Sequence, residues 1–331
     1  MKLSVLIPLY NEKNYISSCL DSVLSQDFPK EEMELLLMDG MSTDGTREII
    51  EEFARKHENV ILIDNPERIV PCAMNRGIRV ARGEIILRMD AHASYASNYC
   101  STLVNWLERL DATNVGCVWK TDVKKRTSVA LAIREVLSSR LGVGNSQFRI
   151  GADEVMLVDT VPFGCWRKST FEKYGMFDER LVRNQDIELN RRIERMGGKI
   201  YLVPDTTCTY YARETFPALA KNNFENGKWN LLTLYLTHSK SLSIRHFIPL
   251  LFVLSLLLPI LFSPLYAPLI FVAVASLCAY LFLVFFVSAK LSLSKKLNFC
   301  SLIFAFLTLH LSYGIGSLWG LGCCFVCKKS R

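Results

Sequence analysis

The sequence predicts an α/β protein whose doubly wound, mostly parallel sheet is followed by C-terminal transmembrane helices. Two observations support this prediction. Strand-like apolar runs alternate with helical patterns from Leu3 to Met89, which is typical of a parallel sheet. From Phe247 to Arg331 the chain contains no Asp or Glu at all. We therefore expect a soluble domain over residues 1–240 and a membrane domain over residues 246–327.

Each element of the soluble domain has its own pattern. Short apolar runs predict strands, and apolar residues at helical spacing between them predict helices. The expected strands are 3–8, 34–38, 60–64 and 84–89, and the expected helices are 14–24, 46–57 and 70–82. Ligands of such sheets bind outside the carboxyl ends of the strands. Acids stand at three of these ends, namely Asp39, Asp64 and Asp90, so we expect the site at this rim.

Two common nucleotide-binding motifs are absent from the rim. No G-x-G-x-x-G follows the first strand, which argues against dinucleotide binding, and no G-x-x-x-x-G-K-[ST] indicates a P-loop NTPase. The net charge of +7 has no accompanying basic-aromatic motif, so we expect no nucleic-acid partner. This charge fits anionic lipid headgroups instead.

Three segments of the tail are apolar enough to cross a bilayer, which takes about 20 residues. They are roughly residues 247–263, 265–289 and 299–326. Basic residues stay on the cytoplasmic side, so Lys290, Lys295 and Lys296 predict a cytoplasmic loop and a cytoplasmic soluble domain. The basic end at Lys328 disagrees, because three crossings would place it outside. Glycines make the third segment a poor straight helix, and a re-entrant or interfacial position stays open for it.

Four motifs follow one another in order along the soluble domain. They are PLYNE at 8–12, MDGMSTDGT at 38–46, AMNRGIRVARGEIILRMDAH at 73–92, and FGCWRKSTFEKYGMFDERLVRNQDIELNRRIERMGGKI at 163–200. Over about residues 1–235 this set resembles the inverting family 2 glycosyltransferases with the GT-A fold. It looks most similar to the membrane-attached glucosyltransferases of bacterial exopolysaccharide assembly, the succinoglycan type. The resemblance implies transfer of a hexose from a nucleotide sugar, with a UDP-sugar as the expected donor.

The resemblance also implies residues that bind the donor. They are Pro8, Tyr10, Glu12, Asp39, Asn75, Gly77, Arg213 and Lys228. Asp39 would accept a hydrogen bond from a uracil-like N–H, although a turn or helix-start role is an alternative for this acid. Arg213 and Lys228 are candidates to offset the charge of the leaving diphosphate.

Asp90 and His92 are expected to hold a divalent metal ion, Mn²⁺ or Mg²⁺. Alternate residues of an extended chain project to the same face, so both side chains could bind one ion. The usual pair of the family is two carboxylates, which suit Mg²⁺, whereas imidazole suits softer first-row ions. His92 has two alternatives, which are direct contact with the diphosphate and a hydrogen bond to a loop carbonyl.

Asp186 is implied by the resemblance as the general base that takes the proton of the acceptor hydroxyl. Gln185 stands where the family often has Glu, which leaves Asp186 as the base candidate of this segment. Glu188 is expected to be a helix-face residue or hydrogen-bond partner. Aromatic residues between Phe216 and Trp229 suit an amphipathic interfacial helix within the segment 205–240.

The expected acceptor is a lipid-linked saccharide, because the tail would hold the site against membrane lipid. We expect a multi-pass protein of the cell inner membrane with a cytoplasmic catalytic domain. Two alternatives stay open: a polyprenyl-phosphate hexosyltransferase, and a non-catalytic membrane scaffold suggested by His92 and Gln185. A nucleotidyltransferase is disfavoured, because no G-x-G-T-R loop follows the first strand.

Overall fold

The computed structural model describes residues 1–238 and 242–329, with side chains to residue 325. The chain forms two compact units, Met1–Lys120 with Gly151–Tyr210, and Thr121–Ile150 with Tyr211–Arg331. This division differs from the one expected near residue 240. The expected boundary rests on the change from polar to apolar sequence. The units reflect which segments pack together, and residues 121–150 pack with the C-terminal helices.

The first unit is built on a mixed sheet, which has nine strands within the described residues, in the order β3-β2-β1-β4-β8-β6-β9-β5 with β7 beside β9. The strands are β1 Leu3–Leu9, β2 Met33–Asp39, β3 Val60–Asp64, β4 Ile85–Arg88, β5 Ala93–Tyr95, β6 Asn114–Asp122, β7 Met156–Leu157, β8 Cys165–Arg167 and β9 Ile200–Tyr211. The strands β3, β2, β1 and β4 are parallel, whereas β8 pairs antiparallel with β4 and β6, and β9 with β5 and β7.

Helices of the first unit alternate with the parallel strands, as the sequence predicts. They are α1 Ile16–Leu24, α2 Thr46–Lys56, α3 Val70–Val80, α4 Tyr99–Arg109, α8 Ser169–Tyr174 and α9 Gln185–Arg195, with the 3₁₀ turn η1 at Lys30–Glu32. Every residue of β2 is buried, because helices cover both faces of a parallel sheet, and the strand is apolar apart from Glu34 and Asp39. The predicted fold class is confirmed, and the predicted elements lie within a few residues of their expected bounds.

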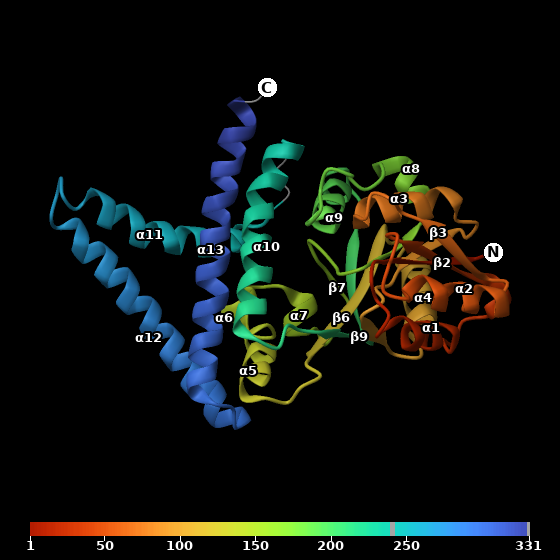
Figure 1. Ribbon diagram of the computed structural model, residues 1–331, viewed down its shortest axis with the longest axis horizontal. Coiled ribbons are helices and arrows are strands. Elements are labelled where there is room, and N and C mark those ends of the chain that lie inside the picture. The colour runs from red at the N-terminus through yellow and green to blue at the C-terminus, as the bar shows by residue number, and fades with distance from the viewer. Residues whose placement is uncertain (239–241, 330–331) are drawn as a thin grey trace. The chain divides into compact units, whose positions relative to one another are not determined.

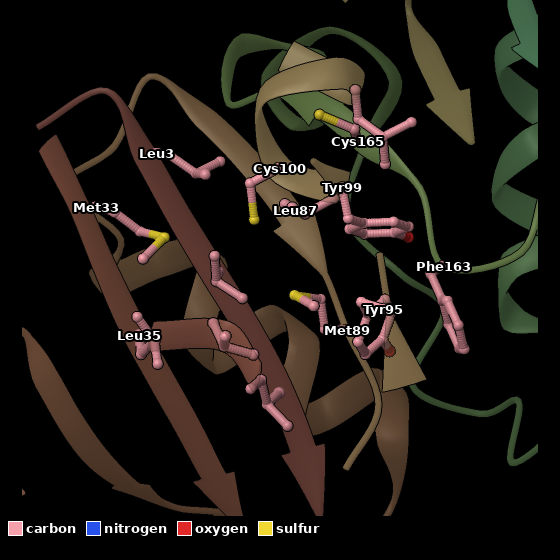
Figure 2. Close-up of a cluster of buried hydrophobic side chains, with 14 of the residues drawn as sticks. Leu3, Met33, Leu35, Leu87, Met89, Tyr95, Tyr99, Cys100, Phe163 and Cys165 are labelled. Carbon is pink, nitrogen blue, oxygen red and sulfur yellow. The ribbon is translucent and has the colours of Figure 1, made fainter. Parts of the chain in front are cut away.

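The core of the first unit lies against one face of the sheet (Figure 2). Leu3, Met33 and Leu87 come from three adjacent strands and are all fully buried. Tyr95 and Tyr99 extend the cluster, with ring centroids 4.7 Å apart. The packing fixes the strand ends that carry the acids, because a shift of one residue would turn these apolar side chains to the opposite face.

The second unit consists of helices in the described residues (Figure 1). They are α5 Ser128–Val136, α6 Arg140–Val143, α7 Gln147–Ile150, α10 Phe216–Thr237, α11 Ile248–Phe262, α12 Leu269–Lys295 and α13 Phe299–Lys329, with the 3₁₀ turn η2 at Ile244–His246. By length and composition, α12 and α13 could each cross a membrane. Helix α11 has 15 residues, fewer than the roughly 20 that a crossing needs.

The expectation that glycines make the third apolar segment a poor helix is wrong. Helix α13 is continuous, and it packs closely along α10. A side chain at Gly316 or Gly320 would clash with the backbone oxygen of Phe224 or Lys228. Small residues allow two helices to approach this closely, so the glycines serve helix packing.

Helix α10 does not present the expected apolar face. Its buried residues are Leu219, Asn223, Gly227, Asn230 and Thr233, spaced three or four apart. Most of this stripe is small or polar, and the Asn230 side chain donates to the Tyr313 hydroxyl of α13 at 2.6 Å. The stripe therefore pairs α10 with another helix.

Candidate active site

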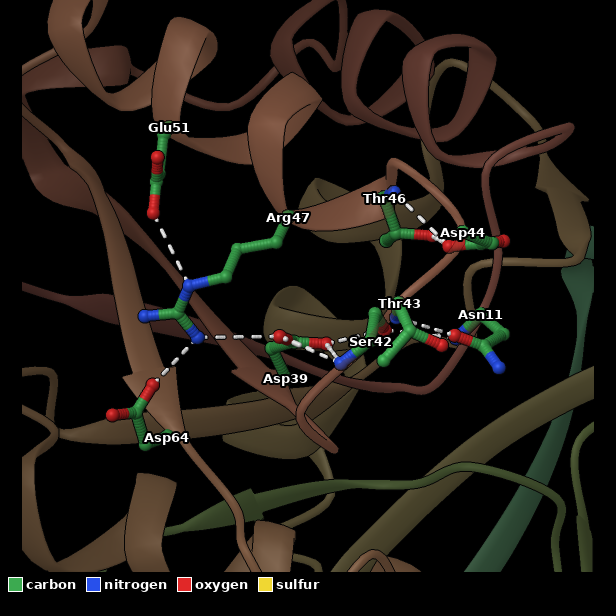
Figure 3. A network of polar contacts seen from close by, with 9 residues as sticks. All are labelled: Asn11, Asp39, Ser42, Thr43, Asp44, Thr46, Arg47, Glu51 and Asp64. Atoms are coloured by element: carbon green, nitrogen blue, oxygen red, sulfur yellow. Dashed lines mark hydrogen bonds and ion pairs between the residues drawn. The ribbon is translucent and has the colours of Figure 1, made fainter.

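The loops that follow β1 and β2 are tied together at the carboxyl ends of these strands (Figure 3). The backbone N–H of Asn11 donates to Ser42 Oγ at 2.8 Å, and Asn11 Oδ1 accepts from the N–H of Thr43 at 2.9 Å. The N–H of Glu12 donates to Thr46 Oγ1 at 2.8 Å. These bonds hold the PLYNE loop against the start of α2.

Asp39 ends β2 with a fully buried carboxylate. Its oxygens accept from the hydroxyl of Ser42 at 2.5 Å and from Arg47 Nη1 at 3.3 Å. Arg47 also pairs with Asp64 at 2.7 Å, and this hydrogen bond raises the pKa of the guanidinium (Figure 3). The structure thus gives Asp39 the turn role left open as an alternative. Its bond to a nucleobase stays a prediction.

Tyr10 presents an exposed aromatic ring at the same rim. The residue is 43% exposed and follows β1, where Pro8 pairs in register with Met38. The guanidinium of Arg68 lies 5.6 Å from the ring centroid. Gly40 lies so close to Tyr10 that a Cβ there would stand 3.1 Å from the tyrosine side chain. An aromatic ring held in this way can stack on a nucleobase.

Asn75 and Gly77 lie inside the fold. The Asn75 amide donates to the carbonyl oxygen of Phe177 at 2.9 Å and to Glu179 at 2.8 Å, and Asn75 Oδ1 accepts from the N–H of Phe177 at 3.0 Å. A Cβ at Gly77 would stand 2.8 Å from Leu6 Cδ2. Both residues therefore position α3 against the sheet and the loop after α8.

Arg88 is a buried cation at the end of β4, and sequence reasoning missed it. Its side chain is 7% exposed, with Nε 3.1 Å from Asp90 Oδ1 and Nη2 3.4 Å from Oδ2. The guanidinium lies 5.6 Å from the ring centroid of Phe163. Burial alone would lower the pKa of Arg88, but the carboxylates of Asp90 and Asp186 raise it above its ordinary value. The guanidinium therefore pairs with the predicted metal ligand, and the charge of the predicted base also favours its protonated form.

Asp90 and His92 lie in a turn, so the extended geometry expected for them is wrong. The N–H of Ala93 donates to the carbonyl oxygen of Asp90 at 3.3 Å, and that of Asp90 donates to the Tyr95 hydroxyl at 2.6 Å. Imidazole Nδ1 of His92 lies 3.0 Å from Glu12 Oε1. The turn thus directs His92 toward the PLYNE loop.

One carboxylate and one imidazole at this turn could serve as ligands of a divalent ion. No cluster of three or more His, Cys, Asp and Glu side chains suited to a metal exists in the described part of the chain. Mg²⁺ commonly keeps few protein ligands and completes its shell with water and substrate phosphates, and nitrogen ligands suit Mn²⁺ as well. The donor set of Asp90 and His92 fits such a two-ligand site.

Asp186 lies in the first turn of α9 and is half-buried. Its Oδ1 accepts from the N–H of Ile187 at 2.9 Å. Gln185 is buried, and its Oε1 finds no hydrogen-bond partner among the described residues. Glu188 accepts from Arg192 Nη2 at 2.7 Å, which confirms its predicted part as a hydrogen-bond partner.

Arg213 and Lys228 belong to the second unit. Arg213 is exposed ahead of α10. Lys228 Nζ lies 3.4 Å from Glu225 Oε2 of the same helix. Their contact with the leaving diphosphate stays a prediction.

Comparison with known proteins identifies relatives over most of the chain. Residues 4–175 match the family model described as Glycosyl transferase family 2. The chain is 30% identical over 230 residues to the dolichyl N-acetyl-alpha-D-glucosaminyl phosphate 3-beta-D-2,3-diacetamido-2,3-dideoxy-beta-D-glucuronosyltransferase of Methanococcus voltae, covering 68% of this chain and 71% of the relative. It is 29% identical over 257 residues to the succinoglycan biosynthesis protein ExoA of Rhizobium meliloti (strain 1021), covering 74% of each.

Two solved structures share the fold. The mannosyltransferase PcManGT from Pyrobaculum calidifontis, in complex with GDP-Man and Mn²⁺, superimposes with a TM-score of 0.60 at 21% identity, covering 96% of this chain and 87% of that one. TarS 1-349 of S. aureus in complex with UDP-GlcNAc gives a TM-score of 0.53 at 17% identity, covering 97% and 92%. At such identities the likeness shows the fold alone, which is the GT-A fold.

Proposed function

Because the chain belongs to glycosyl transferase family 2, we propose that this enzyme transfers a hexose from a nucleotide sugar to a lipid-linked saccharide, with inversion at the anomeric carbon. One observation supports the site above all others. Asp90 and Asp186 are 96 residues apart in sequence (186 − 90), yet Asp90 bonds the buried guanidinium of Arg88 and the charge of Asp186 helps to raise the pKa of the same group.

In the proposed reaction, Asp186 takes the proton of the acceptor hydroxyl as the hydroxyl oxygen attacks the anomeric carbon. The bond between this carbon and the diphosphate oxygen breaks, and the nucleoside diphosphate leaves with the electron pair. A single displacement inverts the configuration and needs one base. In the first turn of α9, Gln185 is an amide and Glu188 is bonded to Arg192, which leaves the Asp186 carboxylate for this role.

The donor would lie across the loops that follow β1 and β2. The exposed ring of Tyr10 would stack on the base, a contact worth about 1–3 kcal/mol. Asp90 and His92 would bind a divalent ion, Mn²⁺ or Mg²⁺, which offsets negative charge on the leaving diphosphate. The Mn²⁺ and GDP-Man in the PcManGT complex, and the UDP-GlcNAc in the TarS complex, support a metal and a nucleotide-sugar donor.

The acceptor is proposed from the names of the relatives and from the apolar tail. The Methanococcus relative is named for a dolichyl-phosphate-linked sugar, and the Rhizobium relative for succinoglycan biosynthesis. Helices α12 and α13 are long and apolar enough to cross a membrane, which supports membrane attachment. We propose the cell inner membrane, with the first unit on the cytoplasmic side.

Product analysis tests this proposal against its nearest alternative. Membranes that contain the protein would be incubated with a panel of labelled nucleotide sugars, and the lipid products would be hydrolysed. A glycosidic sugar–sugar bond is expected. A sugar linked directly to lipid phosphate would instead identify a polyprenyl-phosphate hexosyltransferase. Calorimetry that shows no UDP binding with any divalent ion would favour a non-catalytic scaffold.

A further inference from the structure

Helix α13 is apolar enough to cross a bilayer, yet it packs against charge-bearing helices along both of its halves, in addition to the apolar helices α11 and α12. Its C-terminal half packs along α10, at the level of the Glu225–Lys228 ion pair of 3.4 Å. Its N-terminal half packs against α5 and α6, where His310 Nε2 lies 2.9 Å from the carbonyl oxygen of Leu141. Charged side chains at membrane depth are costly. This packing therefore disfavours a position of α13 within the hydrocarbon core.

The two ends of the α11–α12 hairpin are attached to the same polar segment, residues 121–150. Before α11, Arg245 Nη1 donates to Asn145 Oδ1 at 3.1 Å. At the end of α12, Lys295 Nζ lies 2.6 Å from Oε1 of Glu135, a residue that is 5% exposed. Both ends of the hairpin are basic and are bonded to residues 121–150. The hairpin would therefore enter and leave a membrane from the same side.

The rest of the hairpin is apolar and unpacked. In α12, 11% of the most apolar window is buried, and Phe271, Phe282 and Phe286 are 72%, 73% and 62% exposed. The tip, residues 263–268, carries no charge, and Leu265 is 84% exposed. An uncharged stretch this exposed fits the hydrocarbon of a bilayer, and its basic ends fit anionic headgroups.

The length of α11 limits how deep the tip can reach. Fifteen residues at 1.5 Å each give about 22 Å, less than the hydrocarbon thickness of about 30 Å. Helix α11 starts against α13, because a Cβ at Gly314 would clash with the carbonyl oxygen of Pro249. The tip therefore lies about one length of α11 away from α13. This distance is shorter than the thickness of the hydrocarbon core.

We propose that α11 and α12 form a re-entrant hairpin that dips into the lipid from one face, with α13 lying on that same face. The tip ends within the bilayer. On this proposal none of the three apolar segments crosses the membrane, and the basic C-terminus stays on the side of Lys295. Three crossings would put the basic C-terminus and the basic loop around Lys295 on opposite sides of the membrane. The re-entrant arrangement keeps both on one side.

Accessibility of single cysteines to a membrane-impermeant maleimide tests the proposal. The background would be the full chain with Cys278, Cys300, Cys323, Cys324 and Cys327 changed to alanine, because the six cysteines of the first unit are buried. Ala267→Cys and Leu265→Cys report on the tip, Ser294→Cys on the end of α12, and Gly322→Cys on the end of α13. All four positions are exposed in the structure. Labelling would be measured in sealed vesicles of both orientations, made with anionic lipid.

The proposal expects Ser294→Cys and Gly322→Cys to be labelled from one and the same face. Both tip variants should be protected from both faces and become labelled in detergent. Tip labelling from the opposite face would show two crossings, and tip labelling from the same face would show that the hairpin lies outside lipid. Labelling of Gly322→Cys from the face opposite Ser294→Cys would show that α13 crosses. Any of these three results overturns the proposal, and none depends on sugar transfer.

Discussion

Arg88 Nε lies 3.1 Å from Asp90 Oδ1, and the negative charge of Asp186 also helps to hold the pKa of this guanidinium above its ordinary value. The arginine is 6% exposed as a residue, so its charge is compensated by these acids. Removing one partner of a buried ion pair leaves the other uncompensated and costs about 3–5 kcal/mol. Arg88 therefore holds the Asp90 turn in place and compensates the negative charge of both acids.

Replacing Arg88 should affect stability and catalysis together. Arg88→Gln leaves two carboxylates without their cation, and we expect a loss of about 3–5 kcal/mol in the free energy of unfolding, with reduced transfer. Arg88→Lys should recover part of both. Arg180→Gln is the matched control, because the Arg180–Asp178 pair has a 58% exposed arginine side chain and such pairs contribute up to about 1 kcal/mol. Equal losses in chemical unfolding for both glutamine variants would contradict a buried charge cluster.

Asp186→Asn should separate catalysis from donor binding. The amide cannot accept the proton of the acceptor hydroxyl, so transfer should fall by roughly 10² to 10⁴, while UDP affinity measured by calorimetry stays near its original value. Asp111→Asn removes a carboxylate that is 91% exposed and serves as the control. Near-normal turnover of Asp186→Asn would exclude this residue as the base.

The metal preference should depend on His92. Asp90→Ala should remove metal-dependent UDP binding and nearly all activity. His92→Asp replaces imidazole by a harder ligand, so the ratio of the Mg²⁺-supported to the Mn²⁺-supported rate should rise. His92→Asp also places a second carboxylate near Glu12, which is 3.0 Å from the imidazole, and this should make UDP binding depend more strongly on the ion. An unchanged ratio with retained activity would show that His92 does not touch the ion.

Tyr10 should contribute to donor affinity through its ring. Tyr10→Ala removes the exposed aromatic face and should weaken UDP binding by about 1–3 kcal/mol. Tyr10→Phe keeps the face and should bind UDP nearly as the parent does. Calorimetry of both variants measures the difference. Equal UDP affinity of the alanine and phenylalanine variants would show that the nucleobase does not stack on Tyr10.

Local patterns made the first ninety or so residues predictable, because buried strands such as β2 and amphipathic helices such as α2 leave clear signals in the sequence. Asp90 and Asp186 were singled out from motifs, and their catalytic roles stay predictions. What the sequence could not show depends on distant contacts. Asn75 is bonded to a backbone 102 residues away, and residues 121–150 pack with the C-terminal helices. The turn at Asp90 also escaped prediction, because Tyr95 fixes it through a hydroxyl bond that no spacing rule predicts.

The anomeric configuration of the product is the sharpest test of inverting transfer with Asp186 as the base. Membranes that contain the parent protein or Asp186→Asn would receive the accepted nucleotide sugar and its lipid-linked acceptor, and the new bond would be assigned by NMR. We expect the parent to form a sugar–sugar bond with configuration opposite to that of the donor, and Asp186→Asn to form almost none. A product that retains the donor configuration, or that Asp186→Asn forms at the parental rate, would contradict it.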